Sequence, residues 1–138
     1  MALGNRVLLV EDDPDTREVM ALLLAAAGYE VLTAREADEA LQLIGEKPEI
    51  DVIVTDVNIG FGQDGVSMAE EIRRRGSHAS IVVVSGDPEA SCARLGPTAT
   101  FLRKPYDRRT LLAAIADACA KNADAHLSSS AVSDPASF

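Results

Sequence analysis

The feature that most constrains the fold of this chain is a regular alternation of short apolar runs with longer amphipathic stretches. The short runs are rich in Val, Ile and Leu and are apolar throughout rather than at every second position. That pattern is typical of strands covered on both faces, as in parallel sheets. Strand–helix–strand connections of this length need right-handed crossovers, so we expect an open, doubly wound α/β fold. The predicted strands are residues 6–10, 30–34, 51–55, 80–84 and 100–103.

The first amphipathic stretch has clear helix start and stop signals. Asp13 suits the N-cap, Pro14 the first helical position, and Gly28 the end of the helix. Apolar residues repeat at i, i+3, i+4 and i+7, which predicts one buried helical face. That predicted face consists of Val19, Leu22, Leu23 and Ala26.

Further helices are predicted between the later strands. One spans about residues 66–75, a short one lies in 88–95, and Asp107 can cap the last. The predicted inward residues of the second helix are Ala37, Ala40, Leu41 and Ile44, and those of the last helix are Leu112, Ile115 and Cys119. The segment 122–138 is rich in Ser, Ala and Asp, which predicts a disordered tail after a domain at 5–121.

Length and charge limit the class of protein. A chain of 138 residues suits one domain, and its formal net charge of −9 opposes binding to nucleic acid phosphates. The excess of acidic residues either favours the binding of a hard cation or contributes only to solubility. No signal peptide pattern or apolar run of about 20 residues occurs, so the expected location is the cytoplasm. Cys92 and Cys119 form no metal-binding pattern and are interpreted as reduced apolar residues.

Polar side chains follow four of the predicted strands, at the point where each strand ends. The carboxyl ends of parallel strands meet at one edge of an open sheet, which is where such folds place their functional groups. The residues delivered there are Glu11, Asp12 and Asp13, then Asp56, then Ser85 and Gly86, and finally Lys104.

This set of residue types suits phosphoryl transfer. Crowded carboxylates repel one another unless a cation is present, and Mg²⁺ takes one or two carboxylates together with phosphate oxygens. An Asp carboxylate such as Asp56 can act as a nucleophile and form an acyl phosphate, while Lys104 and Ser85 can contact phosphoryl oxygens. Each residue also has a structural explanation, because Asp13 can be an N-cap and Lys104 a surface amine. Only the phosphoryl-transfer hypothesis explains why they coincide at one edge.

The motifs resemble those of a known family. They are LLVEDDP at 8–14, VIVTD at 52–56, VVVSG at 82–86 and FLRKP at 101–105. Over about residues 5–120 the chain resembles the receiver domains of bacterial two-component response regulators. The resemblance implies a flavodoxin-like, CheY-like sheet of five parallel strands in the order 2-1-3-4-5, with about five helices.

The resemblance also implies roles for individual residues. Asp56 is the expected phosphoacceptor, and the Lys104–Pro105 bond is expected to be cis. The expected ligands of Mg²⁺ (or Mn²⁺) are Glu11, Asp12, Asp56 and the backbone carbonyl of Asn58. The residues expected to contact the phosphoryl group or switch with it are Ser85, Gly86, Lys104 and Phe101. Asn58 and Asp87 are expected to tune dephosphorylation.

The chain departs from the family pattern in four places. Glu11 replaces the commoner Asp, and the loop 58–65 is about one residue longer and lacks the usual proline. The stretch 85–101 is about three residues short, and Phe101 has no hydroxyl. The last two departures affect the usual output face but leave the expected phosphorylation chemistry intact.

The implied function is a signalling domain rather than a separate enzyme, one that promotes its own phosphorylation and dephosphorylation. The expected donor is a phosphohistidine on a histidine kinase or phosphotransfer protein, and the expected output is a downstream protein. Neither nucleic acid nor membrane binding is expected, and a homodimer is left open. The alternatives are a phosphate sink for a kinase, a small phosphatase of the haloacid dehalogenase type, a nucleotide-binding module, or a receiver that works without phosphorylation. Glycine-rich phosphate-binding motifs such as GxGxxG are absent after the first strand, which argues against nucleotide binding.

Overall fold

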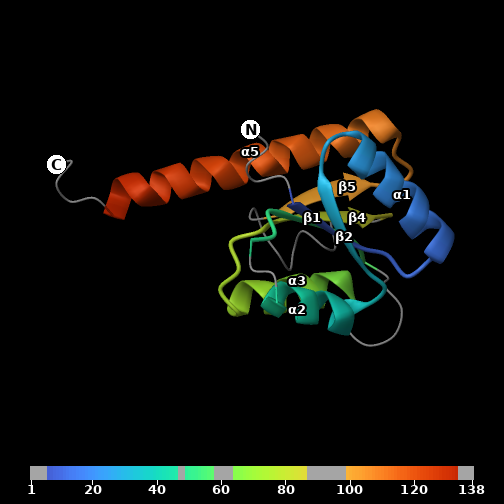
Figure 1. The fold of residues 1–138 in the computed structure, drawn as a ribbon, viewed down its shortest axis with the longest axis horizontal. Coiled ribbons are helices and arrows are strands. Elements are labelled where there is room, and N and C mark those ends of the chain that lie inside the picture. Colours follow the sequence, from blue (N-terminus) through green and yellow to red (C-terminus); the bar gives the residue numbers. More distant parts are fainter. Residues whose placement is uncertain (1–5, 47–48, 58–63, 87–98, 134–138) are drawn as a thin grey trace.

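A computed structural model describes residues 6–46, 49–57, 64–86 and 99–133. It contains one sheet of five strands in the order β2-β1-β3-β4-β5, and all pairings are parallel. Helices cover both faces of this sheet (Figure 1). The strands are β1 (Arg6–Val10), β2 (Glu30–Ala34), β3 (Val52–Asp56), β4 (Ser80–Ser85) and β5 (Ala99–Arg103). The predicted fold class and strand order are therefore confirmed.

The described residues form four helices. They are α1 (Pro14–Ala26), α2 (Ala37–Glu46), α3 (Gly65–Arg74) and α5 (Arg108–Ser133). The predicted short helix at 88–95 lies outside the described residues. Within the part of the chain that is described, no helix combines the length and apolar character needed to span a bilayer.

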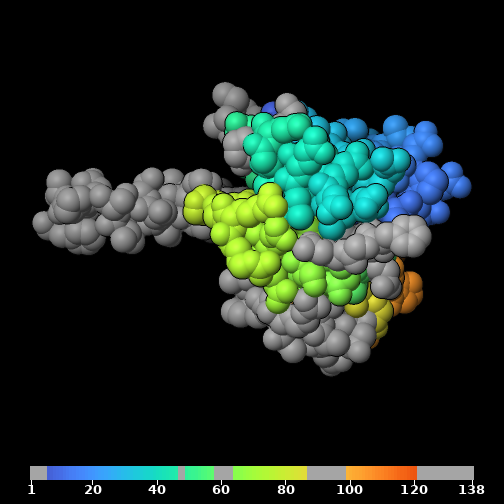
Figure 2. Space-filling model, turned by 90° about the horizontal axis from the view of Figure 1, so that it is seen from below, coloured from blue at the N-terminus to red at the C-terminus, as the bar shows by residue number. Residues whose placement is uncertain are grey.

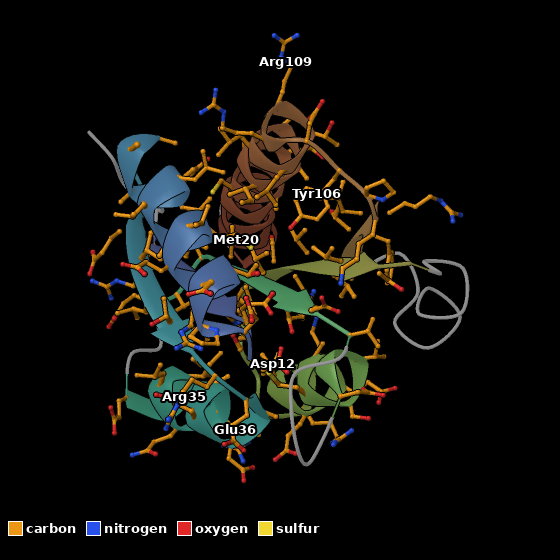
Figure 3. All side chains as sticks on the ribbon, turned by 90° about the vertical axis from the view of Figure 1, so that its right-hand side faces the viewer. Asp12, Met20, Arg35, Glu36, Tyr106 and Arg109 are labelled. Atoms are coloured by element: carbon orange, nitrogen blue, oxygen red, sulfur yellow. The ribbon has the colours of Figure 1, made fainter. Side chains whose placement is uncertain are left out.

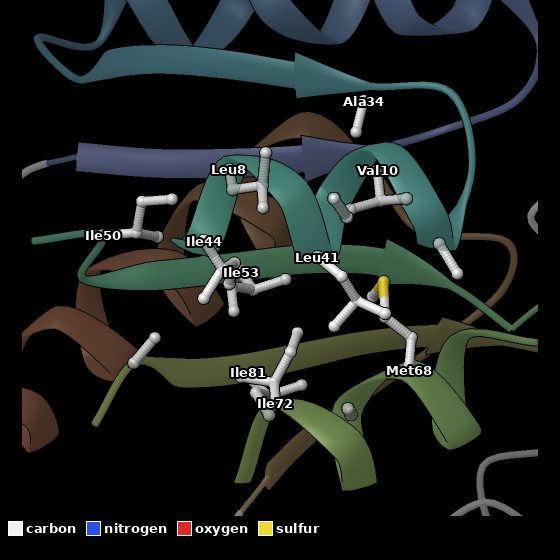
Figure 4. Packing of buried hydrophobic residues seen from close by; sticks show 14 of the residues in the cluster. Leu8, Val10, Ala34, Leu41, Ile44, Ile50, Ile53, Met68, Ile72 and Ile81 are labelled. Carbon is white, nitrogen blue, oxygen red and sulfur yellow. The ribbon is translucent and has the colours of Figure 1, made fainter. Parts of the chain in front are cut away.

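Two hydrophobic clusters hold the layers together, one on each face of the sheet. Helices α2 and α3 lie side by side over one face (Figure 2), and their cluster includes Leu8, Ile53 and Ile81 from the strands (Figure 4). All four residues predicted to face inward from α2 are buried. The second cluster joins α1 and α5 to the opposite face.

The predicted inward face of α1 is wrong for Val19, Leu22 and Ala26, which are exposed, whereas Leu23 is partly buried against the second cluster. Val19 and Leu22 are each 65% exposed, whereas Met20 and Leu24 are buried. The helix is so rich in Leu and Ala that two adjacent stripes have helical spacing, and periodicity alone does not choose between them. Packing against the sheet selects the Met20 and Leu24 stripe, which belongs to the second cluster.

The inward face of α5 is confirmed only in part. Ile115 is fully buried as predicted, but Leu111 and Ala118 are its buried neighbours, while Leu112 and Cys119 are partly buried. The buried stripe is therefore centred one residue earlier than the spacing of Leu112 and Cys119 predicts.

The length of α5 also differs from the sequence expectation. The helix continues to Ser133, beyond the sheet (Figure 1), whereas a disordered tail was predicted from residue 122. Physically, a buried apolar stripe is not required for a helix, because alanine has the highest intrinsic helix propensity. The segment 116–125 contains five alanines, so its helix propensity is high although the predicted buried stripe ends at Cys119.

Candidate functional site

The register of the sheet brings the predicted site residues to one edge. Val10 in β1 pairs with Thr55 in β3, and Asp56 pairs with Val84 in β4. Ser85 in turn pairs with Arg103 in β5. The residues that follow these strands therefore meet at the carboxyl edge. Figure 3 looks onto this edge, where Asp12 lies between α1 and α3.

Asp56 and Lys104 form an ion pair across this edge. The Lys104 Nζ donates a hydrogen bond to Asp56 Oδ2, and the Asp56 side chain is only 13% exposed. This hydrogen bond raises the pKa of Lys104 above its ordinary value. The backbone N–H of Lys104 donates to the Ser85 carbonyl over 2.9 Å, which ties the end of β4 to the residue after β5. The Lys104–Pro105 bond is cis, as expected.

The acids after β1 lie close to Asp56. Burial raises the pKa of Glu11, and the negative charges of Asp56 and Asp12 raise it further. The Glu11 side chain also accepts a hydrogen bond from the backbone N–H of Asp13 over 3.2 Å, which opposes the rise. Three acidic residues from two adjacent strands therefore share one region of negative potential.

Asp13 has the structural role predicted for it. Its backbone is extended at φ −80° and ψ 119°, and its carboxylate accepts the N–H of Thr16 over 2.8 Å. This contact lowers the pKa of Asp13, because it stabilises the charged form. Asp13 is thus the N-cap of α1, and its carboxylate is turned toward the helix.

The other predicted site residues differ in burial, and two of them lie outside the described residues. Ser85 is buried at the end of β4, and Gly86 is exposed, with its carbonyl accepting a 3.3 Å hydrogen bond from Arg103 Nη1. Phe101 is partly buried in β5 and packs against the cluster under α2 and α3. Asn58 and Asp87 lie outside the described residues.

Two residues that the sequence did not single out support the edge, one from α1 and one from the β5–α5 connection. Arg17 Nη1 donates to the Glu11 carbonyl over 3.0 Å and so holds the acidic β1–α1 loop. The Tyr106 hydroxyl donates to Met20 Sδ over 3.8 Å, joining the β5–α5 connection to α1. Burial is the main cause of the raised pKa of Tyr106, and Glu11 and Asp56 add to it. Neither contact follows from residue spacing, since the first depends on the rotation of α1 and the second on how α1 packs against the β5–α5 connection.

A glycine allows α3 to start directly against the end of β3. Gly65 donates its N–H to the Val57 carbonyl over 2.7 Å. A Cβ at Gly65 would overlap the Asp56 carbonyl oxygen and lie 2.9 Å from Thr55 Oγ1. Thr55 Oγ1 itself donates to the Asp56 carbonyl over 2.8 Å. The sequence shows Gly65 only as the glycine that ends the 58–65 loop. Its close contact with Asp56 is seen only in the folded structure.

The donor chemistry of the edge suits a hard divalent cation. Glu11, Asp12 and Asp56 provide carboxylate oxygens that repel one another, and Mg²⁺ commonly binds through one or two carboxylates and several waters. Among the residues that the structure describes, no group of three or more His, Cys, Asp or Glu side chains could hold a metal ion by itself. A cation here would therefore depend on carbonyl or water oxygens as well.

Comparison with known proteins gives a consistent result. The family model for the response regulator receiver domain matches residues 7–116. The chain is 30% identical over 122 residues to the transcriptional regulatory protein GlrR of Escherichia coli (strain K12), covering 86% of this chain and 27% of that protein. It is 31% identical over 122 residues to the transcriptional regulatory protein FixJ of Azorhizobium caulinodans, covering 86% of this chain and 56% of FixJ. It thus spans about a quarter to a half of these relatives.

Solved structures agree with the family match. A response regulator receiver domain protein from Clostridium thermocellum has 28% sequence identity and a TM-score of 0.77, with coverage of 84% of this chain and 94% of that chain. The response regulator protein TrrA from Thermotoga maritima, in complex with Mg(2+)-BeF, has 25% identity and a TM-score of 0.71, covering 83% and 98%. The family model covers most of the chain and the fold agrees with it, so this chain belongs to the response regulator receiver domain family of two-component systems.

Proposed function

We propose that this receiver domain accepts a phosphoryl group on Asp56 in a Mg²⁺-dependent reaction. The observation that carries the proposal is the Asp56–Lys104 ion pair beside the mutually repelling acids Glu11 and Asp12. This arrangement places a reachable carboxylate, a cation for phosphoryl oxygens and oxygen ligands for a metal at one edge. The expected donor is a phosphohistidine on a histidine kinase or phosphotransfer protein.

In the proposed transfer, an Asp56 carboxylate oxygen attacks the phosphorus of the phosphohistidine. The new O–P bond forms as the P–N bond breaks, and that electron pair returns to the imidazole nitrogen. Lys104 and Ser85 stabilise charge on the transferring oxygens, as positioning and charge neutralisation dominate phosphoryl transfer. Bound Mg²⁺ (or Mn²⁺) would supply further charge neutralisation. Asp12 and Asp56 would hold it directly and Glu11 through water.

The product would act as a switch. Phosphorylation adds charge of about −1.5 to −2 and three acceptor oxygens at the carboxyl edge. Ser85, Gly86 and Lys104 are the proposed phosphoryl contacts, and Phe101 the aromatic residue that rearranges. Asn58, which also offers a carbonyl to the metal, and Asp87 are the proposed residues that tune dephosphorylation.

The proposed output is a protein–protein interaction. The formal net charge of −9 opposes direct contact with nucleic acid phosphates by this domain. GlrR and FixJ are named as transcriptional regulatory proteins, and the match to this chain covers only part of each. Any effect of this domain on transcription would accordingly require a further domain or partner.

A phosphotransfer assay tests the proposal. A histidine kinase or phosphotransfer protein labelled on histidine with radioactive phosphate is mixed with the domain, with Mg²⁺ or with EDTA. We expect label to move to the wild-type chain only with Mg²⁺, and Asp56→Asn to remain unlabelled. A parallel assay with a small phosphodonor shows whether Asp56 is phosphorylated even when the chosen kinase is not the partner of this domain. Equal labelling of wild type and Asp56→Asn would refute the assignment of Asp56.

A further inference from the structure

A cavity of about 550 Å³ lies at the opposite edge of the sheet from Asp56, where α2 and α3 end. Its volume falls in the range of small-molecule sites, about 300–1,000 Å³. Its apolar wall consists of Ile44, Ile50 and Ala79, all buried members of the cluster under α2 and α3. Figure 4 shows Ile44 and Ile50 at the start-of-strand end of that cluster. The cavity therefore reaches from the surface into the hydrophobic core.

Two glycines are among the residues that line this cavity. Gly45 lies in the last turn of α2, and Gly76 follows α3 with φ +86°. A Cβ built at either position meets no atom within 4 Å. The first carbon of a side chain added at either lining position would therefore meet no neighbouring atom among the described residues, and a larger side chain at Gly45 would add bulk at the cavity lining.

Both acidic and basic side chains line the cavity. Glu49 and Asp51 line one side, while Arg75 and His78 line the other. The guanidinium of Arg75 is already paired with Glu71, through Nε at 3.2 Å and Nη2 at 2.7 Å.

On the acidic side, a single guanidinium serves two carboxylates. Arg6 pairs with Glu49 over 2.8 Å and with Glu30 over 3.2 Å, while its backbone N–H donates to Asp51 Oδ2 over 2.9 Å. Among the described residues, the four carboxylates in and beside the cavity exceed the guanidinium groups by one, because Arg73 joins Arg6 and Arg75 there through a 3.0 Å hydrogen bond from its Nη1 to the Ala79 carbonyl. The carbonyl ends of α2 and α3, which carry partial negative charge, also lie at this edge.

We propose that this cavity is a binding site for a small organic ammonium compound with an apolar body. The apolar part would lie against Ile44, Ile50 and Ala79, and the ammonium group would face Glu49 and Asp51. A carboxylate or phosphate ligand would meet the surplus of negative charge. This site is separate from the Asp56 edge, and the proposal does not rest on phosphorylation.

Titrations of ¹⁵N-labelled protein with hexylammonium, hexanol and hexanoate test the ligand class. They are run at about pH 8, where histidine side chains are generally neutral. We expect saturable amide shifts at Gly45, Ile50, Ser77 and Ala79 with hexylammonium, and a dissociation constant at least about tenfold higher for hexanoate. Hexanol has the same apolar chain without the charge, so it measures the apolar contribution to binding alone. We expect it to bind more weakly than hexylammonium. Hexanol or hexanoate binding as tightly as hexylammonium would overturn the proposal.

Substitutions locate the site. Gly45→Leu adds a side chain to the open space and suits a helix better than glycine, so we expect a folded protein that binds hexylammonium at least about tenfold more weakly. Ala26→Leu adds similar apolar surface at an exposed position of α1 and should bind like wild type. Glu49→Gln should reduce the preference for hexylammonium over hexanol. Unchanged binding in Gly45→Leu, or amide shifts scattered away from the cavity, would refute the site.

Discussion

At the scale of single residues, the carboxyl edge depends on one contact between groups far apart in the chain and on one local contact. Lys104 reaches Asp56, and Arg17 from α1 holds the Glu11 carbonyl. The sequence predicted that Asp56 and Lys104 would meet, because both follow strands of one parallel sheet. It could not predict Arg17 or the Gly65 contact, because these depend on helix rotation and on how closely α3 approaches β3.

Gly65→Ala tests the close approach of α3 to β3. The added Cβ overlaps the Asp56 carbonyl oxygen, so we expect a loss of about 1–3 kcal/mol in the free energy of unfolding, typical of overpacking. Gly45→Ala is the matched control, because its Cβ meets nothing within 4 Å and alanine favours the helix by about 1 kcal/mol. Urea denaturation measures both. A Gly65→Ala protein as stable as wild type would show that the close contact is not needed.

Glu11→Gln tests the repulsion among the acids. Because the folded state raises the pKa of Glu11 above its ordinary value of 4.5, ionisation of this carboxyl costs stability as the pH rises through the raised pKa. In EDTA, the Gln variant should therefore gain stability relative to wild type between about pH 4 and pH 7. Added Mg²⁺ should reduce that gain, since the cation compensates the wild-type charge. A gap between the two proteins that does not change with pH would contradict this account.

At the scale of elements, local signals predicted where helices start better than which way they face. Asp13 caps α1 and Asp107 accepts the N–H of Thr110 at the start of α5, both as expected from sequence. For α2, the apolar residues form one stripe, and the prediction was right. For α1, two stripes compete, and only packing against the sheet selects Met20 and Leu24.

Leu22 and Leu24 provide a matched test of the rotation of α1. Leu24→Ala should cost about 2–5 kcal/mol of unfolding free energy, because it leaves a cavity in the core. Leu22→Ala should change stability by less than about 0.5 kcal/mol, because Leu22 is 65% exposed. Chemical denaturation of the two variants gives both values. A larger loss for Leu22→Ala than for Leu24→Ala would indicate that the helix is rotated as the sequence spacing predicted, and similar losses would contradict the burial difference between the two residues.

The end of α5 gives a second test at this scale. We propose that the folded unit ends near residue 121, because the buried residues of α5 are found at Leu111, Ile115 and Ala118 among those whose side chains are described. Removing residues 122–138 should lower helical circular dichroism while changing the unfolding free energy by less than about 1 kcal/mol. A larger loss would place these residues in contact with the folded body or with a second copy.

At the scale of the whole molecule, the sequence predicted the architecture well. Each observed strand begins and ends within one residue of its predicted range, and the order matches the family expectation. Buried parallel strands have a strong signature, because both of their faces must be apolar. The helix at 88–95 lies outside the described residues, so the shortened output region stays a prediction. The proposed phosphoacceptor edge and the cavity lined by Ile44 and Ile50 lie at opposite ends of the strands, so their proposed ligands can be tested separately.

The most direct test of the central claim is the intact mass of the protein after incubation with a small phosphodonor. With Mg²⁺, wild type should gain the mass of one phosphoryl group, and mild acid or hydroxylamine should remove it, as expected for an acyl phosphate. Asp56→Asn, or wild type in EDTA, should gain none. If wild type gains no phosphoryl mass, or if Asp56→Asn gains the same labile mass, Asp56 is not the phosphoacceptor of this domain.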